Sequence, residues 1–209
     1  MHMHTSAEST GPEPAAAEPA RPAAGFDGRS FLFLLGSTRS GSNTELLARR
    51  AAEQLPAHVE QRWLRLADLP LPVFEDVRHG DGPNHREPAG HARTLLDATL
   101  GATDLVIASP LYWYAVSTPV KHYLDHWSGW LRVPGVDFRA RMAGRTLWGV
   151  TALAGDDFSD ADPLVGTLDK TARYMRMRFR GVLLGNGTRP GDVLRDQEAL
   201  RKAKTFFTP

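Results

Sequence analysis

Two observations predict an α/β domain built around a parallel sheet. Short apolar runs alternate with amphipathic stretches from about residue 30 onwards, which is typical of strands joined by right-handed helical crossovers. The two clearest runs, 31–35 and 104–110, are almost wholly apolar and do not alternate with polar residues. Such runs are typical of strands in a sheet that helices cover on both faces.

The predicted elements follow in order along the chain. We expect strands at 31–35, 59–66, 104–110, 146–151 and 181–184, and helices at 44–55, 91–100, 118–130, 163–175 and 192–206. The first helix has Leu and Ala at the spacing of one helical face, and Pro110 ends the third strand. Thr118 and Pro119 suit the start of the third helix. Residues 67–90 are rich in Pro, Gly, Asp and His, which predicts a long irregular connection.

The N-terminal stretch differs from the rest of the chain. Residues 1–29 are rich in Ala, Pro, Glu and Gly and have almost no large apolar side chain. They cannot bury enough surface to offset the entropy of ordering the chain, and no apolar segment follows a basic start, as a secretory signal requires. We therefore expect a disordered tail at 1–29 and a single domain at 30–209.

The composition excludes several classes of protein. A net charge of +1 gives no general attraction to nucleic acid or membrane surfaces, and no apolar run approaches the ~20 residues of a membrane helix. The chain has no Cys, which excludes disulfides, thiolate catalysis, Cys-bound zinc and Cys-bound iron–sulfur clusters. We expect a cytoplasmic protein without membrane insertion or nucleic-acid binding.

The loop after the first strand is the strongest functional signal. Residues 36–44 read GSTRSGSNT and lead into a helix. Backbone N–H groups at a helix N-terminus lack partners, and the helix dipole favours an anion there. The spacing fits neither a nucleotide-hydrolysing loop nor a dinucleotide fingerprint. We expect a metal-free site for a terminal phosphate; the alternative is a capped turn with Asn43 or Thr44 as N-cap.

Two further loops fall at the carboxyl ends of predicted strands, where parallel sheets bind ligands. Residues 109–119 contain Tyr112, Trp113 and Tyr114 in succession, and aromatic faces stack well on a flat ring. Their alternative role is packing beneath the next helix or at a subunit contact. Residues 151–157 begin with small side chains that let backbone approach a ligand closely. The three loops together predict a site for flavin mononucleotide (FMN).

Several motifs resemble the NAD(P)H-dependent FMN reductase family, a flavodoxin-like group. The phosphate loop 36–44 is similar to that of the family, and residues 109–113 with 119–125 are similar to its second loop and helix. Residues 140–145 and 173–177 resemble the segments before its last two strands, with Arg145 in place of the usual Lys. The helix that usually ends in Asp-Arg ends here in Asp125-His126.

The resemblance implies a flavodoxin-like three-layer sandwich with a five-stranded parallel sheet in the order 2-1-3-4-5. It also implies that the phosphate of FMN is held by Ser37, Arg39, Ser42, Asn43 and Thr44. The isoalloxazine ring is expected against Pro110, Leu111, Tyr112 and Trp113, with Thr151 and Gly155 at its border or at the ribityl chain.

The implied activity is hydride transfer from NADPH or NADH to FMN, and then to a quinone, a free flavin or a similar small acceptor in a ping-pong scheme. The alternative is a non-enzymatic carrier of flavodoxin type, although such carriers tend to be strongly acidic. A phospho-receiver on the same fold needs acidic residues after the first strand, where this chain has Leu34, Leu35 and Gly36. The family also implies a homodimer or homotetramer, and Trp127, Trp130, Leu131 and Val133 predict an apolar patch if nothing covers them.

Other polar clusters are weaker candidates. His79, His85 and His91 are interpreted as part of a polar loop, and His122 and His126 as packed side chains rather than a zinc site, because no Glu accompanies them. The acidic group after the fourth strand, Asp156, Asp157, Asp160 and Asp162, is interpreted as solvated, with one of them capping a helix. The basic run Arg173, Arg176, Arg178 and Arg180 is interpreted as a solvated helix end, with the phosphates of a nicotinamide dinucleotide as the alternative ligand. We therefore predict no metal site.

Overall fold

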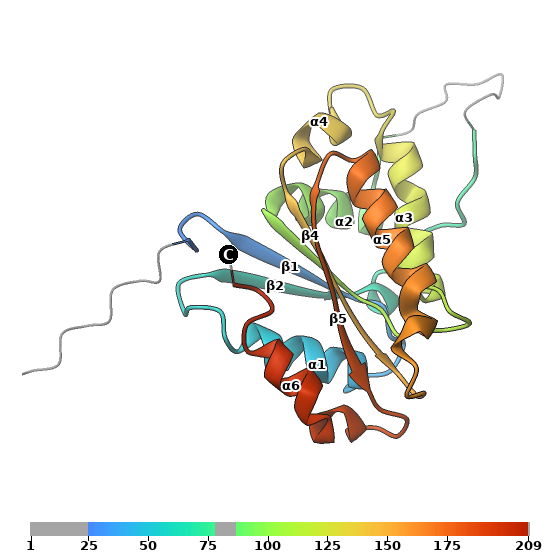
Figure 1. Ribbon diagram of the computed structural model, residues 1–209. Coiled ribbons are helices and arrows are strands. Elements are labelled where there is room, and N and C mark those ends of the chain that lie inside the picture. The colour runs from blue at the N-terminus through green and yellow to red at the C-terminus, as the bar shows by residue number, and fades with distance from the viewer. Residues whose placement is uncertain (1–24, 78–86, 209) are drawn as a thin grey trace, which may run out of the picture.

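A five-stranded sheet forms the centre of the computed structural model, which describes residues 25–77 and 87–208 (Figure 1). All neighbouring strands are parallel, in the order β2-β1-β3-β4-β5. The strands are β1 (Ser30–Leu35), β2 (Glu60–Arg65), β3 (Asp104–Ala108), β4 (Thr146–Leu153) and β5 (Arg178–Asn186). The predicted flavodoxin-like sandwich and its strand order are confirmed.

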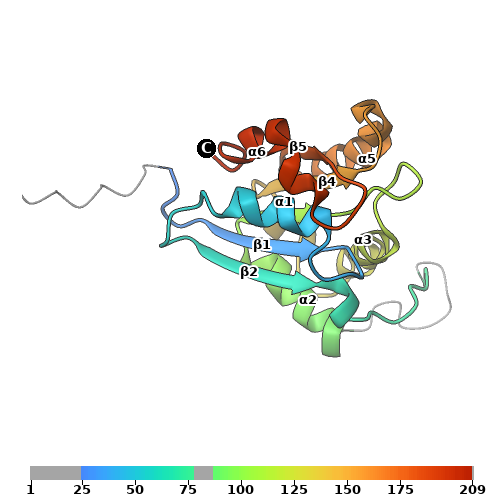
Figure 2. The ribbon, with the colours of Figure 1, turned by 90° about the horizontal axis from the view of Figure 1, so that it is seen from below.

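Helices cover both faces of this sheet. They are α1 (Asn43–Ala52), α2 (Gly90–Gly101), α3 (Thr118–Trp130), α4 (Phe138–Met142), α5 (Asp162–Tyr174) and α6 (Gln197–Ala203), with 3₁₀ turns η1 (Leu66–Asp68), η2 (Phe158–Ala161) and η3 (Asp192–Arg195). Figure 2 shows α1 and α6 on one side of β1, and α2 and α3 on the other.

Alternation along the strands divides the core into two layers. Phe31 and Phe33 of β1 pack with α1 and α6, whereas Leu32 and Leu34 pack with the helices of the opposite face. All four side chains are fully or almost fully buried, because successive side chains of a strand point to opposite faces. The continuous apolar run recognised in the sequence is therefore the signature of a strand covered on both sides.

Several element boundaries differ from the prediction, and three of the differences bear on the site or have a clear local reason. The N-cap of α1 is Ser42, whose Oγ accepts a hydrogen bond from the N–H of Glu45, so neither Asn43 nor Thr44 caps it. The predicted closing helix is split into η3 and α6, because Asp196 has extended backbone and caps α6 at the N–H of Ala199. β4 continues two residues past Thr151 to Leu153.

The apolar patch expected at the end of α3, if nothing covered it, does not form. Trp127 and Trp130 are buried, because Phe138 of α4 packs edge-on against both rings, with centroids 5.2 and 5.5 Å away. Val133 is also buried and Leu131 is half-buried. The sequence analysis missed α4, a five-residue helix too short to show a helical period.

Most of the predicted tail lies outside the described residues, but residues 25–29 are described and contact the domain. Phe26 is buried. The guanidinium of Arg29 makes two hydrogen bonds to the carboxylate of Asp104, at 3.0 and 2.6 Å, and the Asp104 side chain is 2% exposed. Ordered packing thus begins before residue 30, where the tail was predicted to end.

Candidate functional site

The three predicted loops meet at the carboxyl ends of the strands and enclose a pocket of about 150 Å³. Eight of the eleven residues predicted from the sequence line it: Ser37, Arg39, Ser42, Asn43, Thr44, Pro110, Leu111 and Tyr112. The remaining lining comes from Ala152, Leu153, Ala154, Gly187 and Thr188. The loops after β1, β3, β4 and β5 therefore contribute to one site.

The loop between β1 and α1 has the donors that an anion requires. Within the described part of the chain, the N–H groups of Thr38, Ser40 and the first-turn residues Asn43 and Thr44 have no hydrogen-bond acceptor. The guanidinium of Arg39 is exposed and forms no ion pair with a described residue. Unpaired N–H groups at a helix N-terminus, beside a free cation, form a site for a phosphate group.

A partly buried ion-pair network holds this loop on the side away from the pocket. The carboxylate of Glu45 accepts hydrogen bonds from the N–H of Gly41 at 3.1 Å and from the guanidinium groups of Arg49 and Arg65. Arg65, at the end of β2, also donates to the carbonyl oxygens of Ser37 and Arg39, at 3.2 and 2.9 Å. Burial raises the pKa of Glu45, but the hydrogen bonds from Arg65, Arg49 and Gly41 outweigh it, so the pKa lies below its ordinary value.

Asn43 joins the phosphate loop to the loop after β5. Its Nδ2 donates to the carbonyl oxygens of Gly187 and Arg189, both at 2.9 Å, and its Oδ1 accepts from the N–H groups of Gly191 and Val193. These four bonds use the full capacity of the amide. The Asn43 side chain therefore positions the pocket wall, which leaves the N–H of this residue as its donor for a ligand.

The aromatic loop is a tight hairpin with two residues at its tip. Tyr112 and Ala115 exchange both backbone hydrogen bonds, at 3.1 and 3.0 Å, and Trp113 and Tyr114 between them have φ of 48° and 63°. Aromatic residues adopt such left-handed backbone at a cost of about 1–2 kcal/mol each. Strain of this kind is common at binding sites, where the surrounding structure holds the side chains in fixed positions.

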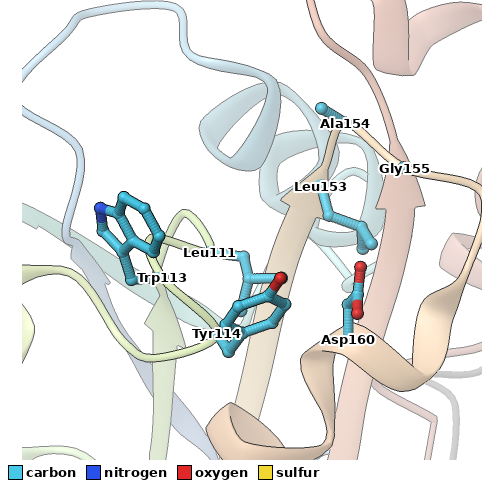
Figure 3. A pocket seen from close by; sticks show the side chains of 7 residues that line it. All are labelled: Leu111, Trp113, Tyr114, Leu153, Ala154, Gly155 and Asp160. Carbon is cyan, nitrogen blue, oxygen red and sulfur yellow. The ribbon is translucent and has the colours of Figure 1, made fainter.

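A second pocket of about 240 Å³ adjoins the first and shares Leu111, Leu153 and Ala154 with it. Figure 3 shows Tyr114 and Asp160 on opposite sides of this pocket, with Trp113 farther out. Trp113 is 92% exposed. Gly155 lines this pocket, whereas Thr151 lines neither pocket: its side chain is fully buried, and its Oγ1 has no hydrogen-bond partner among the described residues.

The residues that sequence reasoning missed had a recognisable signal. Gly187 and Thr188 follow β5, whose carboxyl end lies at the same edge as the other three, so the strand-end rule applied to them as well. Ala152 and Leu153 were assigned to the loop because the strand was predicted to end at Thr151. Tyr114 was named with its two aromatic neighbours but not chosen as a site residue, and Asp160 was interpreted as solvated; the hairpin and η2 bring both to the second pocket.

The remaining clusters form no further part of this site. No three metal-binding side chains gather anywhere in residues 25–77 and 87–208, and Asp157 instead caps the N–H of Ser159. α5 ends at Tyr174, so Arg178 and Arg180 belong to β5 and not to a helix end. Arg178 begins β5, roughly 25 Å from the carboxyl end that borders the pocket, which argues against the alternative role in binding a dinucleotide.

Comparison with known proteins decides the family. The model of the family "NADPH-dependent FMN reductase" matches residues 30–160. The chain belongs to this family of FMN reductases. A protein of Bacillus subtilis (strain 168), YwqN, named as an NAD(P)H-dependent FMN-containing oxidoreductase, is 35% identical over 174 residues, which cover 82% of this chain and 93% of YwqN.

Solved structures agree with the fold of this family member. The Trp repressor binding protein of Bacillus subtilis superposes with a TM-score of 0.67 at 27% identity, over 85% of this chain and 97% of that chain. An FMN-dependent NADH-azoreductase from Bacillus anthracis, solved in complex with FMN, has a TM-score of 0.56 at 15% identity, over 84% and 96% of the two chains.

Family membership makes FMN the cofactor and a reduced nicotinamide the electron donor, and the pocket fits FMN on its own chemistry. The unpaired N–H groups and free guanidinium of the first loop suit a phosphate, and the apolar and aromatic wall from Pro110 to Tyr112 suits a flat ring. None of the described helices has the length and apolar character needed to span a membrane.

Proposed function

We propose that this protein transfers electrons from NADPH or NADH to a quinone, a free flavin or a similar small acceptor in a ping-pong scheme. FMN, when bound, supplies the hydride chemistry. Ser37, Arg39, Ser42 and the N–H groups of Asn43 and Thr44 hold its phosphate, and Pro110, Leu111 and Tyr112 border its ring, with Trp113 at the adjoining second pocket.

The observation that carries this proposal is the second pocket beside the first. It is open, shares one wall with the proposed FMN pocket, and is bordered by Tyr114, which is 54% exposed. A flat donor and a flat acceptor can use such a pocket in turn, because an aromatic border stacks on many ring systems. A one-electron carrier needs no space of this kind beside its cofactor.

Steady-state kinetics test this function. We expect NAD(P)H oxidation to require a quinone or free flavin, with parallel lines in double-reciprocal plots when both substrates are varied. Intersecting lines would contradict the ping-pong scheme. No oxidation without a partner reductase, in a preparation that retains FMN, would favour the flavodoxin-type carrier.

Arg39 provides a direct test of the phosphate assignment. Arg39→Ala is expected to weaken FMN binding by about 1.5–3 kcal/mol, because it removes a charge-assisted hydrogen bond to the phosphate. Fluorescence titration of the apoprotein with FMN measures this loss, and riboflavin, which lacks the phosphate, is expected to bind both proteins equally. Arg93→Ala, on the exposed face of α2, is the matched control; an equal effect of both changes would overturn the assignment.

We also propose a cytoplasmic homodimer or homotetramer, supported by the exposed Trp113 and Tyr114 beside the pocket. Light scattering of the purified holoprotein measures the oligomeric state. A monomer at micromolar concentration would contradict this part of the proposal without affecting the assignment of the FMN pocket.

A further inference from the structure

A triangle of three polar atoms lies outside the proposed FMN pocket, where the segment after η1 crosses α3. The Nε2 atoms of His122 and His126 lie 3.2 Å apart. The carbonyl oxygen of Pro72 lies 2.7 Å from the first and 3.0 Å from the second. The two histidines are one helical turn apart on α3 and both are partly buried.

Hydrogen bonds alone cannot make all three contacts between these atoms favourable. If both Nε2 atoms carry a proton, both donate to Pro72, but two N–H groups then face each other at 3.2 Å. If only one carries a proton, the lone pair of the other faces the lone pairs of the carbonyl oxygen. Every protonation state therefore leaves at least one contact between two like groups.

A cation satisfies all three contacts at once, because it accepts a lone pair from each atom. Ligands at about 2.0–2.1 Å from a zinc-sized ion are about 2.9 Å apart when they occupy neighbouring octahedral positions. The observed edges of 2.7, 3.0 and 3.2 Å match one triangular face of such a polyhedron. Imidazole nitrogen with carbonyl oxygen suits Zn²⁺, Ni²⁺ or Cu²⁺ rather than Mg²⁺ or Ca²⁺.

The carbonyl ligand belongs to an anchored segment. Pro70 and Pro72 fix the backbone φ, and Leu69 and Leu71 pack against the core. His91 lies with its Nδ1 3.1 Å from the carbonyl oxygen of Pro70, and the ring of Phe74 packs edge-on against His126. The three atoms are thus held in place by their own elements before any ion binds.

We propose that His122 Nε2, His126 Nε2 and the carbonyl oxygen of Pro72 bind one divalent transition-metal ion, with water completing its coordination. Two side chains and one carbonyl make a site for an exchangeable ion and not a closed structural centre. Binding requires the Nε2 lone pairs, so the imidazole protons reside on Nδ1 in the metal-bound form. The ion fastens the segment around Pro72 to α3.

Calorimetric titration of the full chain with ZnCl₂ tests the site. The parent protein carries His2→Gln and His4→Gln and no affinity tag, so that the two imidazoles near the N-terminus cannot compete for the ion. We expect one ion per chain, an affinity lowered about tenfold or more by His122→Gln or His126→Gln, and no change with His58→Gln, a partly exposed histidine before β2, as matched control. Absence of saturable binding in the parent, or equal affinity in all variants, would overturn the proposal.

Two further measurements distinguish the loss of a metal ligand from misfolding of the variant. Zn²⁺ is expected to raise the Tm of the parent and of His58→Gln but not that of His126→Gln, because an ion that binds the folded state stabilises it. With Cu²⁺ as probe, the EPR spectrum should show coupling to two imidazole nitrogens in the parent and to one in His126→Gln. Two nitrogens in both would show that the ion binds elsewhere and overturn the assignment. FMN content is expected to stay constant throughout, because none of the three residues lines the FMN pocket.

Discussion

The ion pair between Arg29 and Asp104 provides the sharpest test of how this domain is stabilised. Asp104 begins β3 and is 1% exposed. Its carboxylate accepts two hydrogen bonds from Arg29, one from Trp148 Nε1 at 2.9 Å and one from Thr103 Oγ1 at 2.8 Å. Arg29 lies in the stretch that the sequence assigned to a disordered tail.

Arg29→Met keeps the apolar stem of the side chain and removes its charge, which leaves a buried carboxylate without a counter-ion. Breaking a buried pair in this way costs about 3–5 kcal/mol. We expect urea unfolding at pH 7 to show a loss of that size in the free energy of unfolding. Arg93→Met is the matched control, because its ion pair with Asp97 joins two half-exposed side chains and such pairs contribute about 1 kcal/mol or less.

The pH dependence of the free energy of unfolding independently checks whether the Asp104 carboxylate causes this loss of stability. Burial raises the pKa of Asp104, but the hydrogen bonds from Arg29, Trp148 and Thr103 outweigh it, so the pKa lies below its ordinary value. In the wild type this stabilisation is therefore present above about pH 4 and is lost as the pH falls through the lowered folded-state pKa.

In Arg29→Met, burial still raises the pKa of Asp104, but the hydrogen bonds and the charge of Arg29 no longer lower it. The pKa of Asp104 is therefore expected to rise. The difference in stability between the two proteins should then be largest near neutral pH and shrink under acidic conditions as the carboxyl group becomes protonated. A loss below about 1 kcal/mol at pH 7, or one that does not diminish with acid, would refute this reasoning.

Three other substitutions test the pocket walls. Gly36→Ala would place Cβ 2.4 Å from Val120 Cγ2 and 2.8 Å from Ser117 Oγ. We therefore expect about 1–3 kcal/mol of destabilisation and weaker FMN binding. Gly101→Ala, with nothing within 4 Å of the added Cβ, should change neither stability nor FMN binding. Asn43→Ala leaves two carbonyl and two N–H groups of the loop after β5 without their partner, so urea unfolding should show a loss of about 1–3 kcal/mol, and faster amide exchange at Gly191 would identify the loop as the cause. Trp113→Gly relieves left-handed backbone at a side chain that is 92% exposed, so the protein should become more stable by up to about 1 kcal/mol while KM for the acceptor rises; unchanged KM would exclude Trp113 from the acceptor pocket.

The sequence predicted the sheet because the relevant signals are local. The burial of Phe31–Leu35 on both faces and the polar loop that follows it can both be inferred from neighbouring residues. The strand order required the family resemblance, because helical crossovers of similar length are compatible with several orders. The phosphate loop and the aromatic loop could be located because they directly follow β1 and β3, the two strands with the clearest apolar runs.

The features that sequence reasoning missed depend on contacts between distant segments. Arg29 belongs to the domain only because Asp104 is buried 75 positions later, and Trp127 is buried because the short α4 covers it. The role of Asn43 at the loop after β5 spans more than 140 positions. Likewise, nothing near His122 or His126 in the sequence indicates that the Pro72 carbonyl lies between them.

The two ends of the domain meet near the amino-terminal end of β1, whereas the pocket lies at the carboxyl ends of the strands. Arg29 reaches the carbonyl oxygen of Phe207 at 3.5 Å, and the rings of Phe31 and Phe207 pack edge to face. A short linker from residue 208 to residue 25 could therefore give a circular permutant with new termini elsewhere. A fluorescent reporter or an electrode linker attached at either position would leave the mouth of the redox pocket clear.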